Sequence, residues 1–186
     1  GDGALGQMME PISFDKVEKL DVPEKTWATT GTQMKRKRNI VNSLYITPEE
    51  LEDLVWEREK RYDAIRAKEA RFEEFETADA DYIIAAYGTT ARIAKNAVKA
   101  LRAEGIKAGL IRPITLWPFP AEAFNKAADT AKAFLSVEMS TGQMVEDVKL
   151  AVNGKKDVFF FGRTGGMVPT PAEIVAKIKE IDGGVR

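Results

Sequence analysis

The sequence contains neither cysteine nor histidine among its 186 residues. Without cysteine, the polypeptide has no means of forming a disulfide bond, a catalytic thiolate or a cysteine-ligated iron–sulfur cluster of its own. Without histidine, it lacks the commonest general base and the commonest zinc ligand. These two absences exclude several classes of catalytic and metal-binding site within this chain.

A net charge of one sign and long apolar runs are missing as well. Lys and Arg number 28 and Asp and Glu number 29, a balance that gives no global attraction to nucleic acid or to an anionic membrane. No window approaches the roughly 20 apolar residues of a membrane span. The first residues have neither the basic nor the apolar region of a signal peptide. We therefore expect a cytoplasmic protein with no nucleic-acid partner and no membrane partner.

One basic run interrupts this balance, Lys35-Arg36-Lys37-Arg38. Such a run could contact nucleic acid, a phosphate-rich cofactor or an acidic partner. Four charges give only a weak, salt-sensitive patch, however, and the flanking composition is balanced. The sequence favours a solvated loop segment at this position.

Residues 81–120 predict two parallel strands joined by a helix. An apolar run over 82–87 is typical of a strand that is covered on both faces. Gly88-Thr89-Thr90 follows as a turn with a hydroxyl able to cap the next helix. Gly105 ends that helix, and residues 106–114 form the second strand. A right-handed crossover is nearly obligatory for such a unit, so the two strands should be parallel.

The same alternation continues to the end of the chain. The expected elements are a helix over 121–129, a strand over 132–139, a helix over 143–152, a strand over 158–162 and a last helix opened by the capping box Thr170-Pro171-Ala172-Glu173. Within the strand over 158–162, helices on both faces would bury Phe159, Phe160 and Phe161. Residues 77–186 therefore predict an α/β fold, a three-layer αβα sandwich with a mostly parallel sheet.

Two segments precede this domain. Residues 1–46 have little periodicity, with glycines at the start and prolines further along, so we expect them to be extended or poorly ordered. Because the chain does not begin with Met, we expect a fragment or a processed product. Residues 47–76 open with the capping box Thr47-Pro48-Glu49-Glu50 and predict one long amphipathic helix of about 28 residues, roughly 42 Å long. We expect this helix to bury its apolar stripe against another chain or domain.

Ligands of a parallel α/β sheet normally bind beyond the carboxyl ends of its strands. Loops with small, hydroxyl or charged residues should meet at that edge, and two of them lead into helix N-termini, which suit an anion. The candidate cofactor-binding or anion-binding residues are Thr89, Thr90, Arg112, Glu138, Gln143 and Arg163. Turn preferences alone also explain the small and hydroxyl residues, with Arg112 paired to Glu138. Neither a dinucleotide fingerprint nor a P-loop is present.

Three segments carry a resemblance to a known family. They are AYGTTARI…LRAEGIKAGLIRPITLWPFP within 81–120, GDGALGQMMEP at 1–11 and VEMSTGQMVEDVKLA at 137–151. Together they resemble the alpha subunit of 2-oxoacid:ferredoxin oxidoreductases, and GDGALGQMMEP at 1–11 looks closest to the 2-oxoisovalerate (branched-chain) members. The resemblance covers essentially the whole chain.

The resemblance implies both the domain layout and the chemistry. Residues 1–46 would be the tail of a truncated thiamine-pyrophosphate pyrimidine domain plus a linker, residues 47–76 a connecting helix, and residues 77–186 a transketolase C-terminal-like domain. The family oxidatively decarboxylates a 2-oxoacid to an acyl-CoA and passes the electrons to ferredoxin. Thiamine pyrophosphate, Mg, coenzyme A and iron–sulfur clusters would belong to the complete complex and none of them to this fragment.

We therefore assign no catalytic residue and no metal ligand to this chain. The implied partners are the thiamine-pyrophosphate (beta), gamma and ferredoxin-like subunits, with ferredoxin as the electron acceptor. By itself the fragment should be inert and architectural. Two alternatives remain open: the corresponding domain of another thiamine enzyme, such as a 2-oxoglutarate:ferredoxin oxidoreductase or a 2-oxoacid dehydrogenase E1 beta subunit, and a non-enzymatic anion-binding α/β module.

Overall fold

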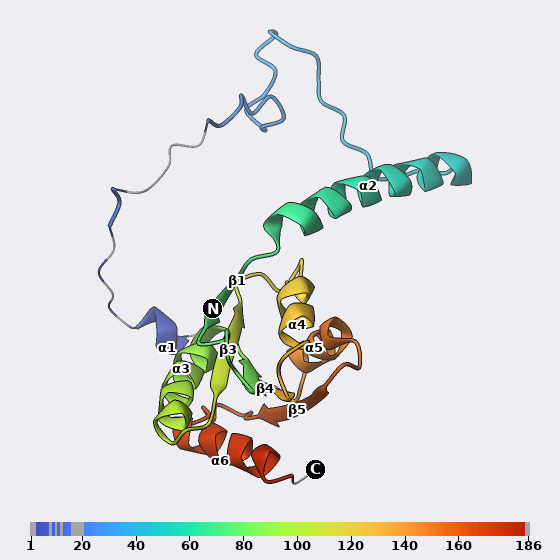
Figure 1. Ribbon diagram of the computed structural model, residues 1–186. Coiled ribbons are helices and arrows are strands. Elements are labelled where there is room, and N and C mark those ends of the chain that lie inside the picture. The colour runs from blue at the N-terminus through green and yellow to red at the C-terminus, as the bar shows by residue number, and fades with distance from the viewer. Residues whose placement is uncertain (1–2, 8, 10, 12, 16–20, 185–186) are drawn as a thin grey trace. The chain divides into compact units, whose positions relative to one another are not determined.

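A computed structural model of the chain describes residues 3–7, 9, 11, 13–15 and 21–184 (Figure 1). The chain divides into two compact units. One comprises Gly1–Gln7 and Arg61–Arg186, and the other comprises Met8–Lys60. The assignment of residues 1–46, 47–76 and 77–186 to a tail, a connecting helix and a domain stays a prediction.

The larger unit is built around a five-stranded sheet with the order β1-β3-β2-β4-β5. The chain order of its elements is β1 (Phe72–Phe75), β2 (Tyr82–Ala85), α3 (Gly88–Ala103), β3 (Ala108–Pro113), α4 (Ala121–Ala127), β4 (Ala133–Glu138), α5 (Met144–Val152), β5 (Asp157–Gly162) and α6 (Pro171–Asp182). β2, β3, β4 and β5 pair in parallel, and β1 pairs antiparallel with β3. This topology confirms the mostly parallel α/β sheet.

Two buried clusters cover the two faces of the sheet, because alternate residues of each strand point to opposite sides. On one face, Ile84, Leu110 and Leu135 pack against the apolar sides of α3 and α6. On the other face, Ile83 and Phe134 pack against α4 and α5. The expected αβα layering is therefore confirmed, and Figure 1 shows the helices on both sides of the sheet.

The expected helix over 47–76 is wrong at its C-terminal end. The helix, α2, spans Pro48–Glu69, and Phe72–Phe75 form the strand β1 instead. The sequence Phe72-Glu73-Glu74-Phe75 alternates in exposure with a period of two, and the edge of β3 offers it a hydrogen-bonding partner. In so short a segment, the same apolar positions fit both a helical stripe and a strand. Pairing with β3 therefore decided which of the two forms.

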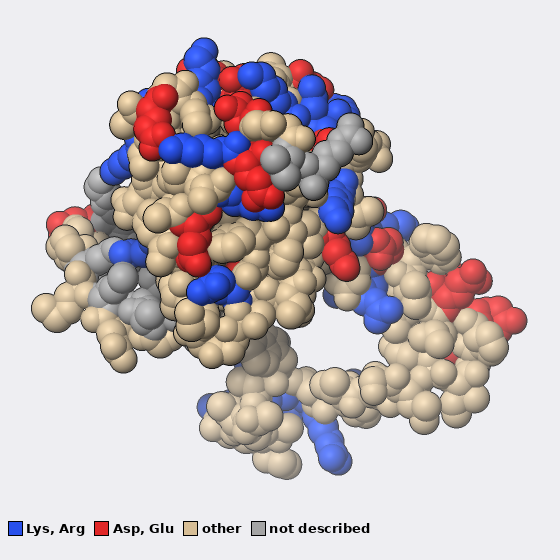
Figure 2. Space-filling model, turned by 90° about the horizontal axis from the view of Figure 1, so that it is seen from below, with Lys and Arg blue, Asp and Glu red and all other residues tan. Residues whose placement is uncertain are grey.

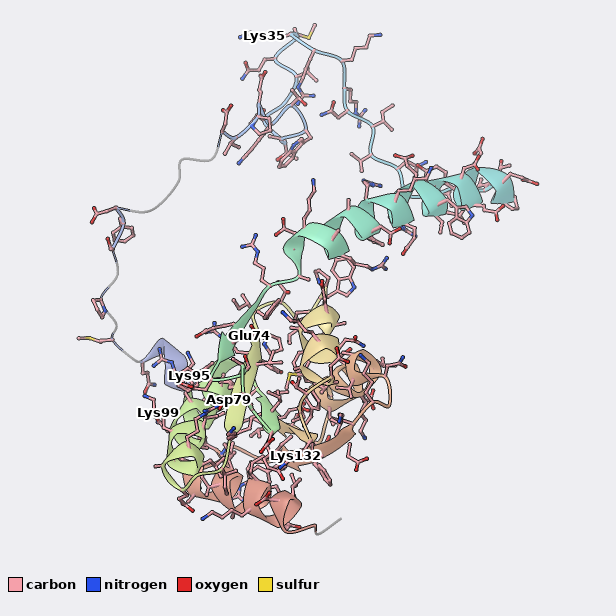
Figure 3. All side chains as sticks on the ribbon, in the orientation of Figure 1. Lys35, Glu74, Asp79, Lys95, Lys99 and Lys132 are labelled. Carbon is pink, nitrogen blue, oxygen red and sulfur yellow. The ribbon has the colours of Figure 1, made fainter. Side chains whose placement is uncertain are left out.

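The expected extended character of residues 1–46 is only partly met. Gly3–Gly6 form the short helix α1, which the sequence did not predict. From residue 21 to residue 46 the described backbone contains turns and no helix or strand. The expectation for residues 1–2, 8, 10, 12 and 16–20 lies outside the described part of the chain. Lys35, the first residue of the basic run, is exposed in this segment (Figure 3).

The apolar stripe of α2 is not buried among the described residues. Leu51, Val55 and Ile65 are 43%, 39% and 37% exposed, and the helix has no buried residue. Its burial against another chain or domain stays a prediction.

Among the described helices, none combines the length and apolarity that crossing a membrane requires. On the face shown in Figure 2, Lys and Arg side chains are interspersed with Asp and Glu side chains.

The expected full burial of Phe159, Phe160 and Phe161 is also wrong, because all three side chains are half-buried. β5 lies at one end of the sheet and has β4 as its neighbour. An edge strand has covering side chains on one flank only, whereas β4, between two strands, is buried at every position.

Candidate functional site

A cavity lies beyond the carboxyl ends of the neighbouring strands β2 and β4. The chain leaves β2 toward α3 on one face of the sheet and leaves β4 toward α5 on the other face. Such a reversal is the point at which open α/β sheets bind ligands. The cavity has a volume of about 420 Å³, and its lining consists of Gly3, Tyr87, Gly88, Thr89, Thr90, Glu138 and Met139.

Glu138, the last residue of β4, is a carboxylate only 3% exposed to solvent. Such a buried charge requires compensation by hydrogen bonds. Its five donors are the hydroxyls of Ser136 (2.9 Å) and Ser140 (2.9 Å) and the backbone N–H groups of Gln143 (3.0 Å), Met144 (3.0 Å) and Val145 (2.9 Å). The three N–H groups belong to the start of α5, so Glu138 closes the positive end of that helix.

These donors fix the protonation state of Glu138. Burial disfavours the charged form and alone would raise the pKa of Glu138. The hydrogen bonds from the Gln143 N–H and the Ser140 hydroxyl, followed by those from Met144 and Ser136, outweigh burial and hold this pKa below its ordinary value. Glu138 is therefore an anion at neutral pH, and it occupies the place where α5 would otherwise receive an external anion.

Among the described residues, no carboxylate is seen to accept from the start of α3 on the other side of the cavity. Its N-cap residue Tyr87 has extended dihedral angles (φ −134°, ψ 169°) and makes no side-chain cap hydrogen bond. The first turn of α3 contains no acidic residue. The expectation that a hydroxyl in the turn 88–90 caps this helix is wrong. Gly88, Thr89 and Thr90 form the first turn of the helix, and the Thr90 hydroxyl donates to the Tyr87 carbonyl oxygen at 2.6 Å.

The remaining sequence-predicted residues lie away from the cavity lining. Arg112 on β3 donates to Glu73 on β1 at 2.7 Å, so the alternative pairing of Arg112 with Glu138 is wrong. The antiparallel register places Glu73 opposite Arg112, and Lys95 of α3 also donates to Glu73, at 2.5 Å. The Lys95 bond and burial are the two largest influences on Glu73, and together with Arg112 the net effect holds its pKa below the ordinary value.

Gln143 and Arg163 serve the structure around the cavity. Gln143 is exposed and contributes its backbone N–H to Glu138. Arg163 follows β5, its backbone N–H donates to the Glu138 carbonyl oxygen at 3.0 Å, and its Nη2 lies 3.5 Å from the Glu173 carboxylate. The structure thus brings Thr89, Thr90 and Glu138 together at the cavity and places the other candidates elsewhere. A cofactor-binding role for any of the six stays a prediction.

Comparison with known proteins decides the family. Residues 80–174, which include the whole cavity apart from Gly3, match the model described as pyruvate:ferredoxin oxidoreductase core domain II. The chain belongs to this family.

The chain is also similar to subunits of known enzymes. The chain is 42% identical over 182 residues to the ketoisovalerate oxidoreductase subunit VorB of Methanothermobacter marburgensis, a match that covers 98% of this chain and 51% of the relative. It is 39% identical over 102 residues to the 2-oxoglutarate synthase subunit KorA of the same organism, covering 55% of this chain and 27% of the relative. The chain thus spans about half the length of the VorB subunits that it matches.

Two solved structures share the fold of this core domain II chain. A 2-oxoglutarate:ferredoxin oxidoreductase from Magnetococcus marinus, with 2-oxoglutarate, coenzyme A and succinyl-CoA bound, superposes with a TM-score of 0.61 at 22% identity. The match covers 73% of this chain and 24% of that one. A split-gene transketolase, an inactive beta4 tetramer, superposes with a TM-score of 0.51 at 22% identity, covering 59% of this chain and 40% of that one. These likenesses support the fold assignment alone.

The donor groups of this core domain II do not fit an iron–sulfur cluster, since the chain has no cysteine. Within the described residues, no three acidic side chains converge as a metal site would require. Glu138, the one carboxylate among the described residues that line the cavity, has its oxygen atoms engaged by five internal donors, which leaves it poorly suited to bind a cation.

Sequence reasoning missed three parts of this site. Tyr87 and Met139 line the cavity, but each is the last residue of an expected strand and was not among the candidate site residues. Ser136 lies inside β4, and its role as a donor to Glu138 depends on a side chain two residues away on the same face. The sequence did contain a signal for this contact. Ser136 and Glu138 are two residues apart in a strand, on the same face, and a helix starts soon after them.

Proposed function

We propose that this chain is part of the alpha subunit of a thiamine-dependent 2-oxoacid:ferredoxin oxidoreductase whose substrate is 2-oxoisovalerate. The observation that carries the proposal is the 42% identity to a ketoisovalerate oxidoreductase subunit over 182 residues. A second VorB subunit, from Methanothermobacter thermautotrophicus, is 40% identical over the same length. In this complex, oxidative decarboxylation of the 2-oxoacid yields an acyl-CoA, and ferredoxin receives the electrons.

The extent of the matches supports the substrate assignment. The two VorB subunits match 98% of the chain, including the segments before and within α2. The KorA subunit of M. marburgensis matches 55% of the chain at 39% identity, and the KorA subunit of Archaeoglobus fulgidus matches 87% of the chain at 28% identity, against 42% and 40% for the VorB subunits. A chain whose whole length follows one subunit type is more simply a member of that type. A 2-oxoglutarate-specific complex is the alternative that the substrate measurement must exclude.

The role of this portion is architectural. Thiamine pyrophosphate, Mg and iron–sulfur clusters supply the chemistry of the complex, and the available side chains favour their being held by other parts of it. The contribution of this chain is a rigid sheet edge. Glu138 fixes the start of α5 to the end of β4, and Thr90 fixes the first turn of α3. We propose that the cavity between these two helix starts forms one edge of the active-site entrance.

Reconstitution of the complex tests the assignment. The complete alpha subunit, co-expressed with its partner subunits, should form acyl-CoA and reduce ferredoxin faster with 2-oxoisovalerate than with 2-oxoglutarate. The 186-residue chain alone should show no activity with either acid. Activity of the isolated chain, or a higher kcat/KM for 2-oxoglutarate in the complex, would overturn the proposal.

A substitution at the cavity tests the entrance role separately. Met139 lines the cavity and is 41% exposed, so Met139→Trp should narrow the cavity and raise KM for the 2-oxoacid several-fold, on the order of 5-fold. Leu150→Trp is the matched control, because Leu150 is 78% exposed on α5 and lies outside the lining. If both variants have the same KM and kcat, the cavity is not part of the active-site entrance, and the family assignment is unaffected.

A further inference from the structure

The two outer strands of the sheet differ in how their open edges are protected. β1 presents Glu73 and Glu74, and charged side chains discourage a further strand from pairing. β5 has the sequence Asp157-Val158-Phe159-Phe160-Phe161-Gly162, with no charge after its first residue. Figure 1 shows the two strands at opposite ends of the sheet. The β5 edge therefore lacks the protection that the β1 edge has.

The exposure of β5 agrees with a missing neighbour. Positions 158–162 are all half-buried, whereas every residue of β4 is buried. Phe159 and Phe161 pack on the cluster of the α3 and α6 face, and Val158 packs on the cluster of the α4 and α5 face. A strand added beside β5 would remove the remaining exposed aromatic surface on both faces from water.

The backbone groups available on this edge follow from one hydrogen bond. The Arg163 N–H donates to the Glu138 carbonyl oxygen of β4 at 3.0 Å. Backbone groups of alternate residues point to the same side of a strand, so positions 159, 161 and 163 face β4. The N–H and C=O groups of Val158, Phe160 and Gly162 consequently face outward, where no strand of the described sheet accepts or donates.

We propose that this edge, residues 157–163, pairs antiparallel with the same edge of a second copy of the chain. The two-fold axis passes at Phe160, which exchanges backbone hydrogen bonds with Phe160 of the second copy. Val158 exchanges them with Gly162 in the same way, so all the outward groups find partners. The pairing joins the two sheets into one continuous sheet and removes both open edges.

Charge complementarity selects this occupant and this register. With the axis at Phe160, Asp157 of each copy lies opposite Arg163 of the other, on the α3 and α6 face. Asp157 is exposed and makes no ion pair among the described residues. Arg163 is half-buried and contacts the Glu173 carboxylate at 3.5 Å through Nη2, and its five N–H donors allow it to bind a second carboxylate. Phe159 lies opposite Phe161 of the second copy, an aromatic cross-strand pair. One strand carries both halves of each contact, as a symmetric pair requires.

Engineered cysteines test the register, because the native chain has none. In this pairing positions 157 and 163 form a non-hydrogen-bonded pair with Cα atoms about 4.5 Å apart, a separation that a disulfide spans. We expect an oxidised equimolar mixture of Asp157→Cys and Arg163→Cys chains to form disulfide-linked dimers. Each single variant oxidised alone should stay monomeric on non-reducing gels. Equal cross-linking of the single variants, or none in the mixture, would overturn the register.

Charge reversal tests the interface without cysteine. Sedimentation velocity over a concentration series should show that the wild-type chain dimerises. Asp157→Arg should raise the dissociation constant of the dimer about tenfold, because the new arginine of each copy then lies opposite Arg163 of the other copy. Glu74→Arg is the matched control: it makes the same charge change on the exposed face of the opposite edge strand (Figure 3) and should leave dimerisation unchanged. A chain that is monomeric at every concentration, or a dimer that weakens equally in both variants, would refute the proposal.

Discussion

The helices α3 and α5 start beside the same cavity, but their first turns differ in hydrogen bonding. At α5, three backbone N–H groups donate to the buried carboxylate of Glu138. At α3, the N-cap residue Tyr87 makes no side-chain cap bond, and the Thr90 hydroxyl donates back to a carbonyl oxygen. Both helices follow a parallel strand, so topology alone does not decide whether a helix start is closed by the protein or left open.

The difference separates a stabilising role from an open one. A buried carboxylate with five donors anchors α5 to β4 and excludes an external anion from that helix start. The start of α3, where Tyr87 gives no side-chain cap, lies at the cavity next to Thr89 and Thr90. Each of the following changes alters one side of this comparison, and they are ordered by the size of the expected effect.

Removal of the Glu138 side chain should have the largest effect. Glu138→Ala leaves the buried Ser136 hydroxyl and the N–H groups of α5 without their acceptor, and should lower the free energy of unfolding by roughly 3 kcal/mol. Urea denaturation measures this change. The control Glu146→Ala, an exposed carboxylate in the first turn of α5, should cost less than about 1 kcal/mol. Similar costs for both variants would show that Glu138 does not anchor the helix.

The acid dependence of stability should report the same carboxylate. The folded-state pKa of Glu138 is lowered, so the unfolded chain binds the extra proton first as the pH falls. The stabilisation by Glu138 is thus fully present above the ordinary glutamate pKa and is lost as the pH falls through the folded pKa. The difference in unfolding free energy between the wild type and Glu138→Gln should shrink over that acidic window. A difference that is constant with pH would contradict the assignment.

The Thr90 hydroxyl should have a smaller effect on the α3 side. Thr90→Val keeps the shape of this buried side chain and removes its hydrogen bond to Tyr87, so unfolding should become easier by about 1 kcal/mol. Thr141→Val is the control, because Thr141 is exposed in the turn before α5. Its expected change stays within about 0.5 kcal/mol. Thermal melts of the two variants side by side would distinguish them.

Adding a cap to α3 should give the smallest effect and the opposite sign. The extended dihedral angles of Tyr87 suit an N-cap residue. Tyr87→Asp should therefore be more stable than Tyr87→Ala by about 0.5 kcal/mol, because the carboxylate accepts from the first-turn N–H groups. Comparing the two variants cancels the loss of the tyrosine ring. If they melt together, the start of α3 already has partners and the contrast with α5 disappears.

Local sequence signals predicted most of the regular elements. The capping box at Thr170 and Glu173 is present with both of its hydrogen bonds, and α6 begins at Pro171 as its pattern indicates. Gly105 has a φ of 85° just after the end of α3, in the left-handed region that its position at a helix end predicts. Such signals act within one turn of chain, so sequence neighbours alone specify them.

The prediction failed where a residue's partner comes from another part of the sheet. Phe72–Phe75 became a strand because the edge of β3 was available, and Arg112 paired with Glu73 because the antiparallel register placed them opposite each other. The candidate site had the same limit. Thr89, Thr90 and Glu138 were predicted as strand-end residues, but which of them meet depends on β2 and β4 being neighbours.

Periodicity, motifs and composition are local properties, and they were enough to predict the alternation of strands and helices, the family of the domain and the lack of thiol or imidazole chemistry. Three features required the folded chain: the antiparallel direction of β1, the closure of α5 by Glu138, and the place of β5 at the edge of the sheet. These features depend on which strands lie side by side, and burial and hydrogen bonding between distant segments fix that order.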